Sequence, residues 1–186
     1  MNTSEQARIP TGRSPIRYAI LPGPLGDMMA VGEPAPDAPG GVALVSLSLP
    51  GQRGRAGVRQ EWRHDPDAFT ALAEQLTAYF DGRRTGFDLA FAARGSAFER
   101  RVWSALEEIP YGTTTTYGAL AGRLGVERGE VRALGAAIGR NPLLVVRPCH
   151  RVIGADGTLK GYAARVGRKK QLLVLEGALQ PQLTLM

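Results

Sequence analysis

The spacing of apolar residues changes along the chain, and this change constrains the fold more than any other feature of the sequence. Near the start, residues 17–21 and 42–49 are apolar or alternating runs of strand length, and the segment 32–41 between them is rich in Gly and Pro. Beyond residue 65 most apolar residues recur at helical spacing instead. The sequence therefore predicts strands first and mainly helices afterwards.

The first helix is predicted over residues 65–82. Asp65 can cap it, and Pro66 suits its first turn. Its apolar stripe is formed by Phe69, Leu72, Leu76 and Phe80. The following residues 83–95 have no helical period, and we interpret them as the connection between two domains.

Three helices are predicted in the middle of the chain. Residues 96–110 open with Ser96 and Glu99 at the spacing of a capping box. One side of this helix carries Phe98, Val102, Leu106 and Ile109. Residues 115–125 and 128–140 are two further short helices joined by a tight turn that contains Gly, a pattern typical of a helix-turn-helix.

The second helix of this pair has two different faces. Core spacing is followed by Val131, Leu134 and Ile138. The other face carries Arg132, Gly135, Ala136 and Gly139. Small residues let a helix backbone approach a surface closely, and an arginine among them can reach beyond it. The alternative is that these small residues simply pack against a neighbouring helix.

Two more elements are predicted near the end of the chain. The apolar residues 143–146 are interpreted as a short buried strand that Pro148 ends. Residues 167–177 form the last helix, which Gly177 stops.

Cysteine and histidine are scarce. The chain holds one Cys and two His, so it can form neither an internal disulfide nor a zinc site of the usual kind. No apolar run is as long as a membrane span, and the first residues lack the apolar core of a signal peptide. We therefore expect a cytoplasmic protein without a metal, whose thiol stays reduced.

Basic residues concentrate around this cysteine. The formal net charge is +6, and residues 140–170 hold eight Lys or Arg against a single acid, Asp156. Such a basic segment predicts a polyanionic partner. The alternative is a solvated basic face without a partner.

Cys149 and His150 are neighbours in the sequence. A free cysteine is ordinarily a small buried hydrophobic residue. In this chain Pro148 breaks the predicted strand just before it, and Arg147 and Arg151 flank the pair. Because nearby positive charge lowers a thiol pKa, this setting favours a reactive cysteine.

A thiol beside an imidazole fits nucleophilic chemistry if the two side chains can meet. Adjacent side chains of an extended strand point to opposite faces, so His150 needs a bend or a bridging water to accept the proton of Cys149. Four residues are available to orient the histidine: Asp156, Glu127, Glu130 and Glu176. These features fit a cysteine hydrolase, and they also fit a redox-sensing DNA-binding protein.

The residues around the cysteine carry a resemblance. Residues 148–153 read PCHRVI, with GRNP at 139–142 upstream and GYA and RKKQLLVLEG downstream. In this combination the sequence strongly resembles the methylated-DNA–protein cysteine methyltransferases, also called O6-alkylguanine-DNA alkyltransferases. The resemblance runs from about Ser96 to Gly177, and it is weaker but recognisable over residues 17–95.

The resemblance implies an activity and a partner. Members of this family transfer the alkyl group of O6-alkylguanine in double-stranded DNA to their own cysteine, and O4-alkylthymine is a second expected lesion. The thioether formed is stable, so one protein molecule repairs one lesion. We expect a monomer that needs no cofactor.

The resemblance also implies a fold of the α/β class with two domains. A small N-terminal α/β domain resembling ribonuclease H is expected at residues 15–90. A mainly helical C-terminal domain with the helix-turn-helix is expected at 91–178, and tails are expected at 1–14 and 179–186.

Residue roles in the reaction follow by position. Cys149 would be the nucleophile, with His150 reaching it through a water and Glu176 holding the histidine. Asn141 matches the hinge that ties the helix-turn-helix to the active-site segment. Tyr117 would crowd the 3′ phosphate of the target nucleotide and donate a proton or hydrogen bond to guanine N3.

DNA-binding roles follow in the same way. Arg132 would fill the space left by the flipped nucleotide, while its helix enters the minor groove along Gly135 and Ala136. Arg151 and Tyr117 complete the expected DNA-binding set.

The substrate pocket is also implied by the resemblance. Tyr162 and Ala163 would line it, with the amide of Ala163 reaching the guanine oxygen. The carbonyls of Cys149 and Val152 would receive the exocyclic amine, and Lys169 would lie close to the pocket.

Four positions depart from the family pattern. Ala164 and Arg165 stand where glycines are common, so they are expected to narrow the pocket or to add a phosphate contact. Gln171 stands where tryptophan is frequent, and Ile138 where bacterial members often carry asparagine.

Two other functions remain open at this point. Relatives in the wider family with tryptophan in place of the cysteine bind lesions without repairing them, and Cys149 argues against that activity. The second alternative is a cysteine hydrolase that turns over many substrates.

Overall fold

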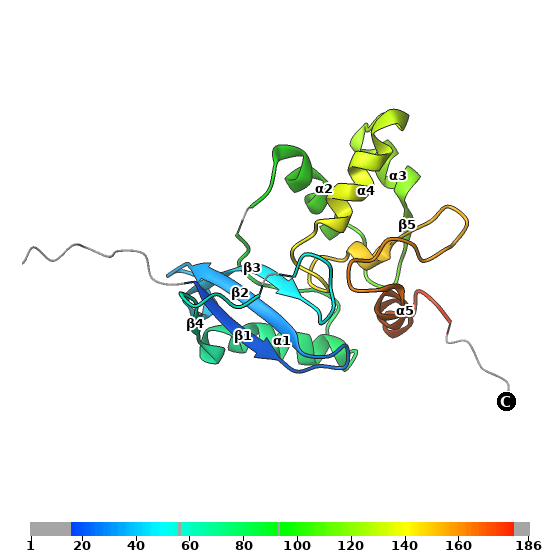
Figure 1. Cartoon of the computed structure of the whole chain (residues 1–186). Coiled ribbons are helices and arrows are strands. Elements are labelled where there is room, and N and C mark those ends of the chain that lie inside the picture. The colour runs from blue at the N-terminus through cyan, green and yellow to red at the C-terminus, as the bar shows by residue number, and fades with distance from the viewer. Residues whose placement is uncertain (1–15, 56, 93, 181–186) are drawn as a thin grey trace, which may run out of the picture.

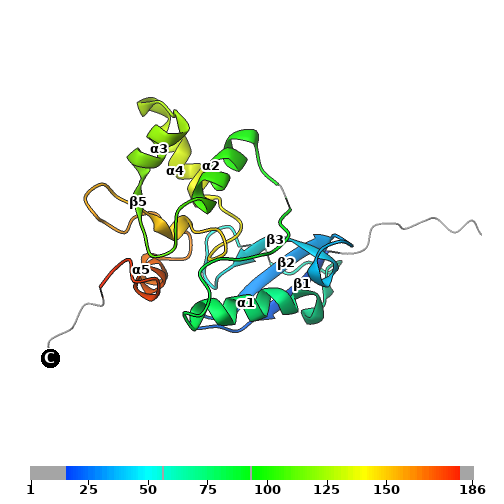
Figure 2. The ribbon, with the colours of Figure 1, turned by 180° about the vertical axis from the view of Figure 1, so that it is seen from behind.

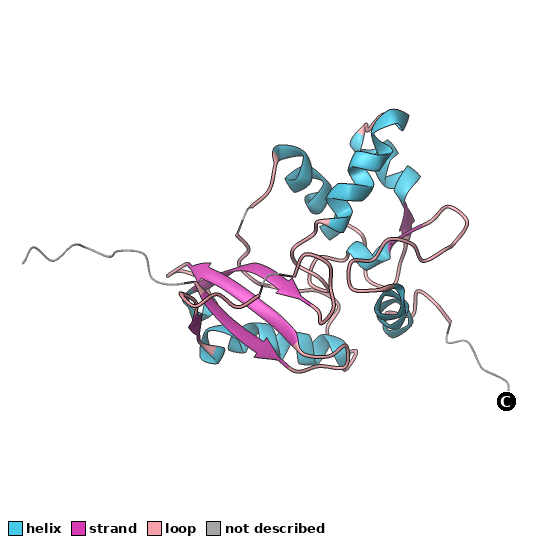
Figure 3. Ribbon diagram, viewed as in Figure 1, coloured by secondary structure: helices cyan, strands magenta, loops and turns pink. Residues whose placement is uncertain are grey.

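A computed structural model of the chain describes residues 16–55, 57–92 and 94–180. The predicted tail at 1–14 and most of the predicted tail at 179–186 therefore lie outside the described residues. A sheet and one helix form one part of the molecule, and the other helices form a second part beside it (Figure 1, Figure 3).

The larger sheet has the strand order β3-β2-β1-β4. Its strands are Arg17–Leu21 (β1), Met28–Pro34 (β2), Val42–Ser48 (β3) and Arg63–His64 (β4). β2 pairs antiparallel with both β1 and β3, whereas β4 pairs parallel with β1. The strands predicted at 17–21 and 42–49 are therefore confirmed.

Strand β2 was not predicted. It includes Gly32, Glu33 and Pro34, so the loop expected at 32–41 begins only after Pro34. Residues 28–32 are all buried, so the strand lacks the alternation that identifies a half-exposed strand. The β2–β3 register shifts between Val31 and Gly32, and a Cβ at Gly32 would lie 3.1 Å from the Cβ of Val42. The glycine thus marks a close approach of strands, not a loop.

The helix predicted at 65–82 consists of a 3-10 turn, Pro66–Phe69 (η2), followed by α1, Thr70–Phe80. It lies along one face of the sheet (Figure 2). Asp65 does not cap it through its side chain, and instead lies 3.6 Å from Arg17 and 3.9 Å from Arg63 in ion pairs. Tyr79, which the apolar stripe did not include, is completely buried.

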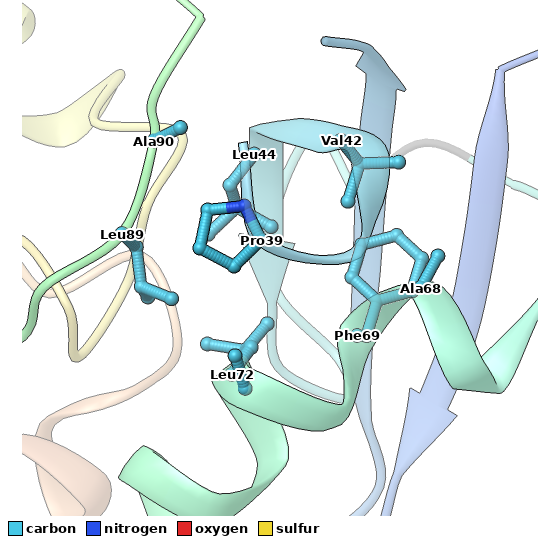
Figure 4. Close-up of a pocket in the computed structure, with 9 residues that line it drawn as sticks. Pro39, Val42, Leu44, Ala68, Phe69, Leu72, Leu89 and Ala90 are labelled. Atoms are coloured by element: carbon cyan, nitrogen blue, oxygen red, sulfur yellow. The ribbon is translucent and has the colours of Figure 1, made fainter. Parts of the chain in front are cut away.

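A small apolar pocket separates η2 and α1 from β3 (Figure 4). Phe69 and Leu72 face Val42 and Leu44 across it, and Leu89 closes one side. Its volume is about 20 Å³. That is room for about one water molecule, so the pocket is a packing gap and not a ligand site.

The connection at 83–95 contains no helix in its described residues. Its path follows β3, because the amide of Leu44 donates to the carbonyl of Ala90 at 2.7 Å and the amide of Ala92 donates to the carbonyl of Leu44 at 3.0 Å. The segment therefore leaves the sheet as an extended chain before the next helix begins.

The second part of the molecule is built from α2 (Ala97–Glu107), α3 (Tyr117–Leu124), α4 (Val131–Gly139) and α5 (Val166–Leu175). Thr115–Thr116 (β5) and Val152–Ile153 (β6) pair in parallel as a second, two-stranded sheet. A left-handed Gly125 ends α3, and a 3-10 turn, Arg128–Glu130 (η3), leads into α4. The four predicted helices of this half are confirmed.

The predicted strand at 143–146 is wrong, although its burial was predicted correctly. Only Leu143 forms a β-bridge, with Leu47, and the chain then turns through Val145 at φ 71°. The side chain of Asn141 explains the turn. Its Oδ1 accepts from the amide of Leu143 at 3.0 Å and its Nδ2 donates to the carbonyl of Arg147 at 3.0 Å, which closes the segment on itself.

The start of α2 yields a stability prediction. Ser96 accepts from the Glu99 amide at 3.1 Å, and Glu99 accepts from the Ser96 amide at 2.8 Å. Ser96→Ala should lower the free energy of unfolding by about 1 kcal/mol, because one helix N–H loses its acceptor. Urea unfolding followed by circular dichroism measures the change. Ser104→Ala, at an exposed site inside the same helix, is the control, and an equal loss there would contradict the capping role.

Candidate active site around Cys149

Cys149 lies in a short 3-10 turn, Cys149–Arg151 (η4), between the turn at 143–147 and β6. Pro148 precedes it with φ −81° and ψ 57°, so the backbone bends there as the sequence predicted. Cys149 is 5% exposed and His150 is completely buried. The bend removes the strand geometry that would have sent these two side chains to opposite faces.

His150 has a defined hydrogen-bond partner. Its Nε2 lies 2.7 Å from Oε1 of Glu176, and both side chains are completely buried. Among the four acids considered, Asp156 is exposed and accepts from Thr158, while Glu127 and Glu130 are exposed. Glu176, at the end of α5, is therefore the carboxylate that orients the histidine.

The other ring nitrogen of His150 is free within the described protein. Nδ1 is buried and has no hydrogen-bond partner among the described residues. A carboxylate accepts only, so Nε2 carries the proton in this pair and Nδ1 has an unused lone pair. The imidazole can therefore accept a proton at Nδ1.

The carboxylate of Glu176 is surrounded by donors. Tyr79 Oη donates to it at 2.5 Å, Arg151 donates through Nε at 2.8 Å and Nη2 at 2.9 Å, and the amide of Gly112 lies at 3.3 Å. Burial alone would raise the pKa of Glu176, but the hydrogen bonds from His150 and Arg151 lower it to about 2. Glu176 is therefore ionised at neutral pH.

Both flanking arginines are buried and bound within the protein. Arg151 is buried, binds Glu176 twice, and donates to the carbonyl of Ile109 at 2.5 Å. This placement contradicts the DNA contact predicted for Arg151, because its guanidinium is committed inside the protein. Arg147 likewise donates to Glu107 at 2.7 Å and stacks over the ring of Trp103.

The thiol pKa also differs from the prediction. Burial raises the pKa of Cys149, and this outweighs the lowering by Asn141, Lys169 and Arg147. Burial lowers the pKa of His150, although Glu176 acts in the opposite direction. A protonated thiol is thus followed in the sequence by a neutral imidazole, so forming the thiolate requires a proton transfer to a base.

Asn141 and Lys169 are both buried near the cysteine. The Asn141 amide bonds the turn at 143–147, as described above, and its hydrogen bond acts to lower the pKa of Cys149. Lys169 Nζ donates to the carbonyls of Val152 at 2.5 Å and Lys160 at 2.9 Å. Its burial lowers the pKa of Lys169 to about 8.

A cavity of about 620 Å³ opens next to this region. Its lining residues are Gly51, Arg53, Gly135, Gly139, Gly161, Tyr162, Ala163 and Arg165. Tyr162 lies between the cavity and the cysteine, since it lines the cavity and Cys149 is close enough to affect it electrostatically. Burial raises the pKa of Tyr162, and the nearby Cys149 raises it further. Its hydroxyl is buried without a hydrogen-bond partner among the described residues.

The cavity brings together some of the predicted pocket residues and adds others. Tyr162 and Ala163 line it, whereas Val152 and Lys169 do not. Gly51 and Arg53 were not predicted: they follow β3, and no spacing in the sequence links this loop to the cysteine. The amide of Arg53 lies 3.4 Å from the carbonyl of Ala163, which joins the two segments.

The two departures after Tyr162 differ in their positions. Ala164 is completely buried and does not line the cavity, whereas Arg165 lines it with φ 78°. A Cβ at Gly51 would lie 3.5 Å from the Arg165 guanidinium, so this side chain lies over the loop after β3. Arg165 therefore forms part of the lining of the cavity, whereas Ala164 does not.

Tyr117 and helix α4 border the same region. Tyr117 Oη lies 3.3 Å from the carbonyl of Lys160. Arg132 and Ala136 are exposed on α4, and a Cβ added at Gly135 or Gly139 would meet no atom within 4 Å. The small residues of α4 thus face open space, which excludes the interpretation that they pack against a neighbouring helix.

The basic segment is less available than its charge implied. Of its members, Arg140 pairs with Glu99 at 2.7 Å and Lys160 lies 3.9 Å from Asp156. Arg168 donates to backbone carbonyls, and Lys169, Arg147 and Arg151 are buried as described. Most of these basic side chains therefore form ion pairs or hydrogen bonds within the protein.

Neither a metal centre nor a membrane span is found in the described residues. No three His, Cys, Asp or Glu side chains gather as metal ligands there. None of the described helices combines the length and apolar character needed to cross a bilayer.

Comparison with known proteins identifies a family. Residues 97–178 match the family model described as 6-O-methylguanine DNA methyltransferase, DNA binding domain. The methylated-DNA–protein-cysteine methyltransferase of Mycobacterium tuberculosis H37Rv is 42% identical over 166 residues, which cover 89% of this chain and 95% of the relative. The enzyme of the same name from Methanosarcina acetivorans is 40% identical, over 87% of this chain and 98% of the relative.

Solved structures of O6-methylguanine methyltransferases also match this chain. The crystal structure of M. tuberculosis OGT in complex with DNA matches with a TM-score of 0.77 and 40% identity, covering 87% of this chain and 93% of that one. The O6-methylguanine-DNA methyltransferase of Pyrococcus kodakaraensis matches with a TM-score of 0.62 at 21% identity, a likeness of fold.

The buried carboxylate yields a prediction about acid stability. Folding lowers the pKa of Glu176 from 4.5 to about 2, so its ionised form stabilises the folded chain above the ordinary pKa and loses this effect as pH falls toward the lowered one. Glu176→Gln should therefore cost about 3 kcal/mol at pH 7, where Arg151 loses its counter-charge, and should flatten the decline in stability between about pH 4.5 and 2.

Urea unfolding over a pH series measures both effects. Glu74→Gln, at an exposed position of α1, is the control and should leave the stability at pH 7 and its acid decline unchanged. An unchanged acid decline in Glu176→Gln would show that Glu176 is not held ionised.

Proposed function

Because this chain belongs to the methylated-DNA–protein-cysteine methyltransferase family, we propose that it repairs DNA by transferring the alkyl group of O6-alkylguanine to Cys149. The single observation that carries the proposal is the contact of His150 with Glu176 beside a cysteine, which leaves Nδ1 of the imidazole free to accept a proton. Burial lowers the pKa of His150, so its imidazole is neutral near pH 7 and can act as a base.

The first step is the formation of the thiolate. The thiol is protonated at rest because burial raises its pKa, and a thiol is a poor nucleophile. A water between the sulfur and Nδ1 of His150 carries the proton to the imidazole. The ionised Glu176 stabilises the imidazolium that results, and the nearby positive charge of Lys169 favours the thiolate.

The second step is an SN2 displacement at the alkyl carbon. A bond forms between Sγ of Cys149 and this carbon, while the bond from the carbon to guanine O6 breaks and its electron pair stays on the guanine. Tyr117 supplies a proton or hydrogen bond to guanine N3, which offsets that charge. The thioether has no hydrolytic route back, so each molecule reacts once.

The cavity beside Tyr162 is the proposed site of the flipped base. Its volume of about 620 Å³ lies within the usual range of ligand pockets, roughly 300–1,000 Å³. Taking a nucleotide out of the duplex costs a few kcal/mol. The amide of Ala163 and the carbonyls of Cys149 and Val152 would offset this cost through hydrogen bonds to the guanine edge.

Helices α3 and α4 act as a helix-turn-helix in this proposal, and α4 enters the minor groove. Support comes from its open face, where Gly135 and Gly139 leave room for a close surface. Arg132 is exposed at the start of this face and would fill the space of the flipped nucleotide. Such binding reads the shape of the groove and little of its sequence, which suits repair at any site.

Several finer features belong to the same proposal. Three antiparallel strands with a helix on one face support a ribonuclease-H-like N-terminal domain at 15–90, followed by the DNA-binding domain at 91–178. We propose a monomer in the cytoplasm, where the thiol stays reduced. O4-alkylthymine is proposed as a second lesion, since the same nucleophile can attack an alkyl group on that oxygen.

The central prediction is a stoichiometric change of mass. Duplex DNA with one O6-methylguanine should add one methyl group per protein molecule, on Cys149, and the reaction should stop there. Mass spectrometry of the intact protein and of its peptides measures this. Unmodified duplex and Cys149→Ser are the controls. An unchanged mass would instead indicate a lesion binder, and many products per molecule would indicate a hydrolase.

A second prediction concerns nucleotide flipping. Arg132→Ala should slow methyl transfer from duplex DNA about 100-fold, because the flipped state loses the group that fills its space, yet leave the reaction with free O6-methylguanine within about twofold. Single-turnover rates with both substrates measure the difference. Arg83→Ala, which removes an exposed arginine of the N-terminal half, should change neither rate. Equal losses with both substrates would contradict the role of Arg132.

A further inference from the structure

We propose that Tyr79 is a positioning residue for alkyl transfer: its hydroxyl fixes the Glu176 carboxylate that in turn orients His150. Tyr79 belongs to α1, which packs on the sheet of the N-terminal half, and it lies 97 positions before Glu176 in the sequence. The role rests on the proposed alkyl transfer to Cys149. It extends the reacting network into the half of the chain that carries no reacting group.

The contact between Tyr79 and Glu176 is short and fully enclosed. Oη of Tyr79 lies 2.5 Å from Oε1 of Glu176, and both side chains are completely buried. The same oxygen, Oε1, receives Nε2 of His150 at 2.7 Å. Tyr79 and His150 therefore share one acceptor atom, and a movement of that oxygen is transmitted to the imidazole.

The direction of this hydrogen-bond chain is determined by its groups. Burial raises the pKa of the Tyr79 hydroxyl well beyond its usual range, and the neighbouring carboxylate raises it further, so Tyr79 stays protonated and donates. Glu176 is ionised and only accepts. His150 must then present Nε2–H to the carboxylate, which keeps Nδ1 available for the proton of Cys149.

Neighbouring aromatic rings fix the orientation of the Tyr79 ring, and with it the direction of its hydroxyl group. Aromatic neighbours surround it: Phe80 at 5.4 Å, Phe87 at 5.3 Å and Tyr111 at 6.0 Å between ring centroids, the last at 90°. Such edge and tilted contacts restrict rotation of the ring. Tyr79 is thus a rigid donor, which suits the orientation of a carboxylate.

Glu176 needs this donor for a physical reason. It is the C-cap of α5, where the partial negative charge of the helix end disfavours a carboxylate. Arg151 and Gly112 satisfy Oε2, so Oε1 depends on Arg151, His150 and Tyr79. Without Tyr79, more of the charge on Oε1 falls on the hydrogen bond to His150.

The change in hydrogen bonding at Glu176 Oε1 determines in which direction the pH dependence of methyl transfer shifts. A carboxylate with fewer donors stabilises the imidazolium more strongly, so loss of the Tyr79 hydroxyl raises the pKa of His150. More histidine is then protonated at a given pH and cannot accept the proton of Cys149. The Tyr79→Phe variant keeps the other ionisable residues near this pair, which are Tyr111, Tyr162, Cys149, Arg151, Arg168 and Lys169.

The test is the pH profile of methyl transfer in Tyr79→Phe, measured under single-turnover conditions with O6-methylguanine duplex. We expect a rate about tenfold lower near neutral pH, a shift of the acid side of the profile to higher pH, and a smaller loss in alkaline solution. If Tyr79 only stabilised the fold, Tyr79→Phe would lower the fraction of protein molecules able to react by the same factor at every pH. An unshifted profile overturns the proposal.

Tyr111→Phe is the matched control. It removes a hydroxyl from a neighbouring ring, but that hydroxyl lies 3.4 Å from the carbonyl of Leu175 and does not bond Glu176. Its rate should stay within about twofold of the parent protein, with the same profile. In the background of Glu176→Gln, Tyr79→Phe should cause no further loss, and an additional tenfold loss would overturn the route through Glu176.

The parent protein offers a measurement that needs no substitution. It has only two histidines, so imidazole nitrogen resonances are readily assigned to His64 and His150. We expect His150 as the neutral Nε2–H tautomer and a far-downfield hydroxyl proton from Tyr79. The Nδ1–H tautomer, or the absence of that proton, overturns the proposal. Failure of the parent protein to become methylated would instead overturn the proposed function.

Discussion

The ionised carboxylate of Glu176 is the interaction on which the rest of the site depends. A buried charge is costly unless it is paired and hydrogen-bonded, and Glu176 meets donors from α1, from the segment after α2 and from the turn that holds Cys149. These segments come from distant parts of the sequence. The carboxylate therefore determines where the histidine lies, and also how three parts of the chain meet.

Burial of the cysteine and its proposed reactivity are compatible because of this arrangement. Desolvation raises the pKa of Cys149, so the resting thiol is inert. The same desolvation lowers the pKa of His150 and keeps it neutral. A neutral base beside a protonated thiol can form the thiolate when the substrate is in place, and a water-poor site then leaves this anion poorly solvated and strongly nucleophilic.

Local rules predicted the parts of the structure that local interactions determine. The capping box of Ser96 and Glu99 and the helix stopped by Gly177 depend on neighbours in the sequence, and both were identified. The buried strand β2 lacks alternation, and the turn after Asn141 depends on a side-chain amide, so apolar spacing could not identify either. Resemblance supplied the candidate roles of His150 and Glu176, but not the partners of the flanking arginines or the contribution of Tyr79, because those contacts join distant segments.

The N-terminal half supports the site at a second place as well. Arg168 of α5 donates to the carbonyl of Leu25 at 3.0 Å, to that of Pro50, and to that of Ala164 at 3.3 Å. It thereby ties two loops of the sheet to the segment that lines the cavity. Gly51 and Arg53 directly follow the Pro50 end of one of these loops and line the cavity as well. A cavity with walls from both halves cannot keep its shape if the halves separate, so the sheet is a structural requirement of the pocket even though it holds none of the reacting atoms.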